Sequence, residues 1–136
     1  MKNSEKLKVF TRSAELVELV FAITRTSPKS TRYDFVSTMH KLALDVLQEL
    51  FKGNDIFWEP GDGQIREREL RAQHFRNARA NTKILIVVSR IAKGVDPKVI
   101  NSQDYMRISK LSIEVQKLLG GMLAADIRRD KSKNGN

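Results

Sequence analysis

Cysteine is absent from this chain of 136 residues. A protein without cysteine has no disulfide, no Cys-ligated zinc, no iron–sulfur cluster and no thiol nucleophile, and it is compatible with a reducing compartment. Long apolar runs are also missing: apolar residues make up 40% of the chain, but none of their runs approaches the ~20 residues that cross a bilayer. No hydrophobic signal segment opens the sequence. We therefore expect a soluble, cytoplasmic protein with no membrane contact.

Proline and glycine are scarce, with three and seven residues, and they are clustered. They separate four long segments in which apolar residues recur every three or four positions, the period of an amphipathic helix. The expected helices are residues 5–26, a second one capped by Ser30 or Thr31 and ended by Gly53-Asn54, residues 64–93, and a fourth one capped by Ser102.

No convincing strand pattern or internal repeat is present, so the predicted class is all-α: an antiparallel four-helix bundle. We expect a single domain over residues 1–127 and a polar, disordered tail over residues 128–136. In the connection between the second and third helices, Trp58 is expected to plug one end of the bundle rather than to stack on a base.

The third helix has an apolar line formed by Leu70, Ile84, Val88 and Ile91, which is the predicted core face. The line passes through Asn77 and Asn81, and we expect these two to be ordinary buried amides that hydrogen-bond across the bundle. Three further apolar residues of the third helix lie off this line: Leu85, Ile86 and Val87. The first helix also has more apolar residues than one core-facing stripe needs, namely Leu16, Leu19 and Ile23. Either the core stripe is unusually wide, or protomers associate through the first and third helices.

Acidic residues are in deficit: 25 Lys and Arg oppose 16 Asp and Glu, for a net charge of +9 and a pI of about 10.0. Residues 66–93 hold eight basic and two acidic residues, a net of +6. At 100° per residue, most of these bases fall on the half of the helix opposite the predicted core line: Arg68, Arg71, Arg76, Arg79, Lys83, Arg90 and Lys93.

Two interpretations of this basic half remain open. It is either a solvated outer face or a surface for nucleic-acid phosphates, which the guanidinium fork grips through two hydrogen bonds. The predicted nucleic-acid contacts are Arg68, Arg71, Arg76, Arg79, Lys83 and Arg90, which would read the backbone or shape rather than the bases.

Tests for catalysis find no support. Carboxylate-bridged metal sites in helical bundles use Glu-x-x-His pairs, but Ser37 and Arg71 precede His40 and His74 by three positions. The glycines do not have the spacing of a phosphate loop, and no serine or aspartate makes a persuasive triad. We expect a protein without enzymatic activity, metal or cofactor.

Two stretches resemble a known superfamily. Residues 27–33, Ser-Pro-Lys-Ser-Thr-Arg-Tyr, resemble the Pro-Lys-Ser-x-Arg-Tyr motif of the four-helix proteins encoded in 23S ribosomal-RNA intervening sequences. Asp104-Tyr105-x-x-Ile108-Ser109 and residues 118–123, Leu-Leu-Gly-Gly-Met-Leu, are similar to the last helix of that superfamily and of its relative, the accessory variability determinant (Avd) of diversity-generating retroelements. Residues 44–53 lack the Asn-Ile-Ala-Glu-Gly ending of the ribosomal-RNA group, which favours the Avd-like branch.

The resemblance implies a protomer that assembles into a pentameric barrel, with basic residues facing RNA or DNA and a reverse transcriptase as partner. The expected function is that of a nucleic-acid-binding accessory protein of a diversity-generating retroelement, which holds template RNA or an RNA/DNA hybrid. The alternatives are a non-catalytic scaffold that docks an acidic protein surface, or an intervening-sequence protein without a reverse transcriptase partner.

Overall fold

A computed structural model describes residues 3–27, 32–61 and 63–134 of the chain. The helices are α1 (Asn3–Thr24), α3 (Ser37–Asn54), α4 (Ile65–Val95) and α5 (Ser102–Asn134), and a π-helical turn, η1 (Arg32–Val36), leads into α3. The described residues contain no strand. The predicted all-α class is therefore confirmed, and the proposed caps Ser30 and Thr31 lie outside the described residues.

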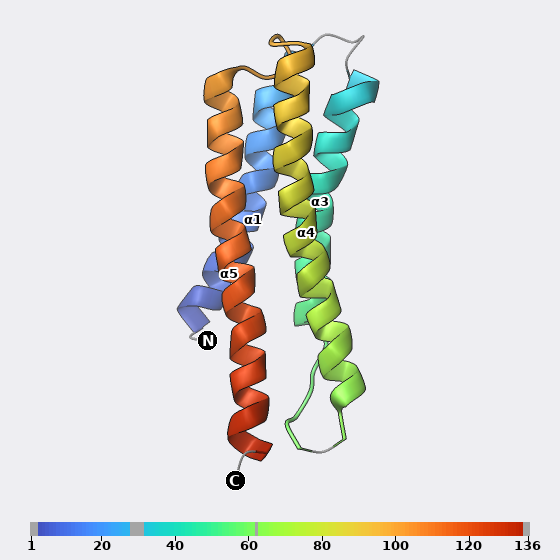
Figure 1. Cartoon of the computed structure of the whole chain (residues 1–136), viewed down its shortest axis with the longest axis vertical. Helices are drawn as coiled ribbons and strands as arrows, with labels where there is room; N and C mark the ends of the chain where they lie inside the picture. Colours follow the sequence, from blue (N-terminus) through green and yellow to red (C-terminus); the bar gives the residue numbers. More distant parts are fainter. Residues whose placement is uncertain (1–2, 28–31, 62, 135–136) are drawn as a thin grey trace.

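The four helices alternate in direction, so α1 and α4 run toward the top of Figure 1 while α3 and α5 run toward the bottom. Each helix packs against two neighbours, in the cyclic order α1, α3, α4 and α5. This is the antiparallel four-helix bundle expected from the sequence. The lower ends of α4 and α5 extend past the start of α1 (Figure 1). None of the helices in the described ranges is both long and apolar enough to cross a membrane.

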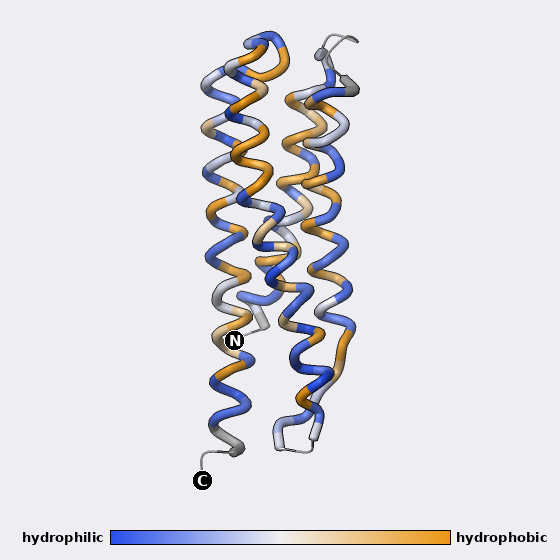
Figure 2. Tube along the Cα trace, turned by 45° about the vertical axis from the view of Figure 1, so that its right-hand side comes forward, coloured by the Kyte–Doolittle hydropathy of each residue, from blue (hydrophilic) through white to orange (hydrophobic). Residues whose placement is uncertain are grey.

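The core consists of two clusters of buried side chains, one above the other. The upper cluster includes Leu16, Met39 and Leu85, and the lower one is built around Phe75, Leu50 and Leu119. Figure 2 shows apolar residues on all four helices, whereas the lower turns of α4 are mostly hydrophilic. The lower end of the bundle therefore depends more on polar contacts than the upper end does.

The predicted core face of α4 is wrong for three of its four residues, and only Val88 packs against the upper core. Leu70, Ile84 and Ile91 are 51%, 47% and 48% exposed. The buried residues of α4 are Phe75, Ala78, Thr82, Leu85, Ser89 and Ala92. Small residues at this contact let helices approach closely, so the face that packs is less hydrophobic than the face beside it. A pattern based on hydrophobicity alone selected the wrong side of the helix.

The two asparagines of that predicted line are not core amides. Asn77 lies on the outer surface of α4, where it accepts a hydrogen bond of 2.8 Å from Gln73 Nε2. Asn81 is partly exposed and likewise lies off the buried line. Neither residue joins helices across the core, which corrects the sequence expectation.

Gly53 and Phe75 set the closest approach of α3 to α4. Gly53 is buried one residue before the end of α3, and a Cβ atom built there would lie 2.7 Å from the Phe75 ring. Carbon atoms in contact normally stay about 3.5–4.0 Å apart. Glycine is therefore required at this position for close packing, in addition to lying near the helix end as the sequence predicted.

The lower end of the bundle is closed by Trp58, which is buried beneath the guanidinium group of Arg129 on α5, 5.0 Å from the ring centroid. The expectation that Trp58 packs at one end is confirmed. The expectation of a disordered tail from residue 128 is not met, because α5 continues to Asn134. The side chains of Arg129 and Asp130 contact the loop and α4, and these contacts hold the last turns of α5.

Candidate nucleic-acid interface

The excess positive charge lies on one side of the bundle. By residue count, α4 holds eight basic and two acidic residues and α5 holds seven and four, whereas α1 and α3 together hold five of each. The connections and termini also balance, with five of each. Helices α4 and α5 therefore account for the whole net charge of +9, and they are neighbours in the bundle.

Arg71, on the core-facing side of α4, is paired within the protein. Arg71 Nε donates a hydrogen bond of 2.8 Å to Asp126 Oδ2, and the two side chains are 12% and 13% exposed. The guanidinium group also donates to the carbonyl oxygen of Gly53 at 3.4 Å and lies 4.8 Å from the centre of the Phe75 ring. This arginine joins three helices and is poorly accessible to a phosphate group.

Arg68 is paired one turn earlier on α4. Its Nη1 atom donates to Asp130 Oδ2, and its Nη2 atom lies 3.4 Å from Glu69 Oε1. Because α5 runs antiparallel to α4, Asp126 and Asp130, four residues apart, come level with Arg71 and Arg68. The structure thus separates these two arginines from the rest of the predicted patch.

The other four predicted residues are exposed along the edge of α4 that adjoins α5: Arg76, Arg79, Lys83 and Arg90. Arg76 Nη2 lies 3.6 Å from Glu69 Oε2. In the described ranges, Arg79, Lys83 and Arg90 form no ion pair. Lys93 lies over the Tyr105 ring at 5.2 Å. The structure therefore brings four of the six predicted contacts together as accessible cations.

A second row of cations on α5 was missed from the sequence. Lys110 and Lys117 are exposed on the outer surface of α5, seven residues apart. The contacts of Lys93 with Tyr105 and of Arg68 with Asp130 establish the register of the two helices. In that register Arg90 is level with Lys110, and Lys83 is level with Lys117. The seven-residue spacing on the fourth helix was the sequence signal that could have identified them.

We call these six residues, on two adjacent helices, the α4–α5 basic face: Arg76, Arg79, Lys83, Arg90, Lys110 and Lys117.

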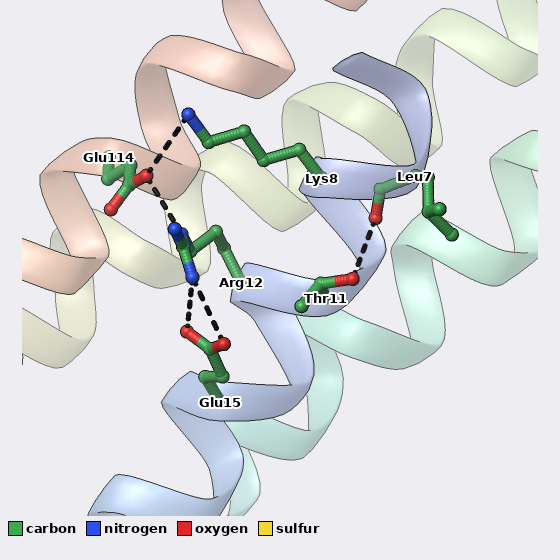
Figure 3. A network of polar contacts seen from close by, with 6 residues as sticks. All are labelled: Leu7, Lys8, Thr11, Arg12, Glu15 and Glu114. Carbon is green, nitrogen blue, oxygen red and sulfur yellow. Dashed lines mark hydrogen bonds and ion pairs between the residues drawn. The ribbon is translucent and has the colours of Figure 1, made fainter. Parts of the chain in front are cut away.

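Glu114, the acidic residue of α5 nearest to these lysines in the sequence, lines the same surface hollow as Lys110 and Lys117, but its carboxylate is paired with α1. Glu114 Oε1 accepts a hydrogen bond of 2.9 Å from Arg12 Nε and lies 3.8 Å from Lys8 Nζ (Figure 3). Arg12 also binds Glu15, one turn along α1, and the contact with Glu114 is the largest cause of its raised pKa. This network joins α1 to α5, so the Glu114 carboxylate, which borders the basic face, already has partners on α1.

Both histidines join helices. His40 Nε2 lies 2.7 Å from Thr24 Oγ1, and its ring stacks on Phe21 with centroids 3.8 Å apart. Burial lowers the pKa of His40, which favours the neutral ring. His74 Nδ1 lies 2.6 Å from Glu49 Oε2. Within the described residues, no three acidic or histidine side chains gather in a way that could hold a metal ion.

Exposed apolar side chains form two further surfaces. One follows α4 and contains Ile84, Val87, Ile91 and Val95. The other lies on α1 and α3 and contains Leu7, Phe21, Leu44 and Phe51. The predicted excess of apolar surface is thus present, but it is formed largely by other residues.

Of the residues first assigned to that excess, Leu16 and Leu85 are fully buried, and Leu19 and Ile23 pack against the upper core. Ile86 is half-buried, and Val87 is exposed on α4.

Comparison of the whole chain with protein-family models, with curated proteins and with solved structures found no match.

Proposed function

We propose that this protein is a non-enzymatic accessory protein of a diversity-generating retroelement, which binds template RNA or an RNA/DNA hybrid and partners a reverse transcriptase. The observation that carries the nucleic-acid part of this proposal is the location of the entire net charge of +9 on α4 and α5. Like charges repel, so such a concentration costs stability, and binding to a polyanion explains why the chain tolerates this cost.

The α4–α5 basic face supplies accessible cations, and the two carboxylates that border it, Glu69 and Glu114, form ion pairs with arginines. Each phosphate that these cations neutralise releases counterions from the nucleic acid, so binding weakens steeply as salt is raised. We expect the face to contact the phosphate backbone, and contacts to phosphates carry no sequence information directly.

The decisive experiment reverses the charge of the face on α4. The triple variant Arg76→Glu, Arg79→Glu and Lys83→Glu is expected to lose RNA binding in fluorescence anisotropy while circular dichroism retains the helical signal. The matched control is Arg25→Glu, Lys41→Glu and Lys98→Glu, which has the same net charge but changes exposed bases outside α4 and α5. Normal RNA binding by the first triple variant, or equal loss in both, would contradict the proposal.

Assembly of protomers into a pentameric ring is part of the proposal and is supported by the two exposed apolar surfaces. They lie on different helices, α4 in one case and α1 with α3 in the other. If the α4 surface of one protomer packs on the α1–α3 surface of the next, the contact is head-to-tail, and a head-to-tail contact that closes generates a ring. The basic faces of all protomers then become parts of one larger binding surface.

Light scattering tests this assembly. We expect the unmodified protein to have the mass of a pentamer and the variant Ile84→Glu with Ile91→Glu to have the mass of a monomer. The control variant, Met106→Glu with Ile113→Glu, introduces the same charge on the exposed surface of α5 and is expected to leave the mass unchanged. A monomeric unmodified protein would refute the assembly.

The reverse transcriptase partner rests on the resemblance of residues 27–33 and of the last helix to the Avd group. We expect the purified protein to form a stable complex with the reverse transcriptase of its own retroelement in size-exclusion chromatography. The second candidate function is a protein-interaction scaffold, which the exposed aromatic residues of α1 and α3 favour. A scaffold would bind its protein partner but show no salt-dependent affinity for RNA.

A further inference from the structure

The exposed aromatic rings lie away from the α4–α5 basic face. In the described residues, the large exposed aromatics are Phe21 on α1, Phe51 on α3 and Phe57 in the α3–α4 connection. Helices α4 and α5 contain two aromatic residues, of which Phe75 is fully buried and Tyr105 lies beneath Lys93. Proteins that bind single strands combine basic grooves with aromatic platforms on which bases stack. The α4–α5 basic face offers no such platform.

The cations form two parallel rows. Arg76, Lys83 and Arg90 follow one another at intervals of seven residues on α4, and Lys110 and Lys117 have the same interval on α5. Seven residues of an α-helix rise about 10.5 Å. Because the helices run antiparallel in the register described above, Lys83 is level with Lys117 and Arg90 is level with Lys110 along the two helices. The face therefore has two level pairs of cations.

Cations on two adjacent helices can reach two lines of phosphates at once, as a duplex presents them. Axes of packed helices lie about 8–10 Å apart, and long Lys and Arg side chains extend this reach outward. The two backbones border a major groove about 12 Å wide in B-form DNA and a wide, shallow minor groove in A-form RNA, so cations on the two rows can engage phosphates on both sides of a groove. A single strand presents one line of phosphates and would occupy one row at a time.

Aliphatic side chains lie beside the lysines of α5. Met106 and Ile113 are exposed there and line one surface hollow together with Lys110 and Lys117. Aliphatic side chains can pack against sugars but do not form hydrogen bonds with base edges. Recognition of shape through the two backbones is typical of proteins that bind double-stranded RNA.

We infer that the α4–α5 basic face binds double-stranded nucleic acid by contacting both backbones, and that it prefers duplexes to single strands. This inference rests on the proposed nucleic-acid binding and specifies its substrate class. It places an RNA/DNA hybrid, rather than the unpaired template, against the protein.

The test measures affinity for four probes of one sequence by fluorescence anisotropy: an unstructured single-stranded RNA, an RNA duplex, an RNA/DNA hybrid and a DNA duplex. Each probe has about 20 nucleotides per strand, which at 3.4 Å per base pair exceeds the length of the face. We expect every duplex to bind at least about tenfold tighter than the single strand, a difference of about 1.4 kcal/mol. Equal or tighter binding of the single strand would overturn the inference and leave the proposed function intact, whereas binding of no probe would refute both.

A pair of variants tests whether both rows take part. Lys83→Ala with Lys117→Ala removes one level pair, and the matched control, Lys41→Ala with Lys98→Ala, removes two exposed lysines outside the face. The first variant is expected to reduce the slope of log affinity against log salt by about 2 for the duplex, because two phosphate contacts are lost. If Lys117→Ala alone changes neither affinity nor slope, the second strand is not contacted and the inference is wrong.

Discussion

The first turns of α4 and its second half contain the same kinds of basic residue in different surroundings. Arg68 and Arg71 lie opposite Asp130 and Asp126 of α5 and form ion pairs in partly buried positions. Lys83 and Arg90 lie opposite a stretch of α5 whose acidic residues, Asp104 and Glu114, are paired elsewhere, with Arg107 and with Arg12. The comparison shows that the bases of α4 remain accessible only where the neighbouring helix supplies no free carboxylate.

The largest expected effect is on stability and comes from the first turns. Arg71→Ala leaves the carboxylate of Asp126 partly buried without its partner, and breaking a buried pair in this way costs about 3–5 kcal/mol. Arg90→Ala, in the second half, is expected to change stability by less than about 0.5 kcal/mol, as exposed substitutions usually do. Urea denaturation of the two variants measures the difference. Equal stabilities would mean that the two regions do not differ as described.

Two glycines, Gly53 near the end of α3 and Gly94 near the end of α4, give the next largest contrast. Gly53→Ala places a methyl group 2.7 Å from the Phe75 ring, and overpacking of this kind costs about 1–3 kcal/mol. Gly94→Ala, in the last turn of α4, meets no atom within 4 Å and is expected to stabilise the helix by about 0.5–1 kcal/mol. Thermal unfolding would reveal the opposite signs. A destabilised Gly94→Ala variant would contradict the open packing of the upper end.

For nucleic-acid affinity we expect the opposite order: substitutions in the second half of α4 should have a larger effect than substitutions in its first turns. Lys83→Gln with Arg90→Gln is expected to leave the free energy of unfolding unchanged. It is expected to reduce the slope of log RNA affinity against log salt by about 2, because two phosphate contacts are lost. Arg68→Lys, which retains charge but weakens the fork-like contact with Asp130, is expected to leave RNA affinity unchanged. Titrations at several salt concentrations measure both. A larger loss of affinity from Arg68→Lys would place the interface at the first turns instead.

The smallest effect concerns His40, which lies on α3 outside both regions. Burial lowers its pKa in the folded protein, so below the unfolded value of about 6.5 the unfolded chain binds more protons. Its contribution to stability is therefore present above about pH 6.5 and declines as the pH falls toward the folded pKa. His40→Gln is expected to flatten this decline in urea denaturation between pH 7 and pH 5. If the His40→Gln variant loses stability over this pH range as the unmodified protein does, groups other than His40 cause the loss.

Helix number, direction and approximate bounds were predictable, because apolar spacing and clustered glycine and proline are local signals. The burial of Trp58 was also predictable, because a large aromatic side chain in a short connection can bury its apolar surface against the nearby end of the bundle. The packed face of α4 was not predictable in the same way. Ala78, Thr82, Ser89 and Ala92 are not the most apolar residues of the helix, and they form the contact because they are small.

The candidate site was predicted in part. Arg76, Arg79, Lys83 and Arg90 share one edge of α4, as the helical period indicated. The pairing of Arg68 and Arg71 required knowledge of which carboxylates on α5 come level with them, which depends on the register of two helices. The same register brings Lys110 and Lys117 beside the α4 row.

The amino-acid sequence alone determined that the chain is helical, that it forms a bundle and that its charge excess is concentrated late in the chain, because these properties depend on composition and on spacing along one helix. Only the tertiary structure decided which cations remain accessible and which apolar residues remain uncovered. Those properties depend on the residues that antiparallel packing brings level across two helices, and the period of one helix carries no information about them.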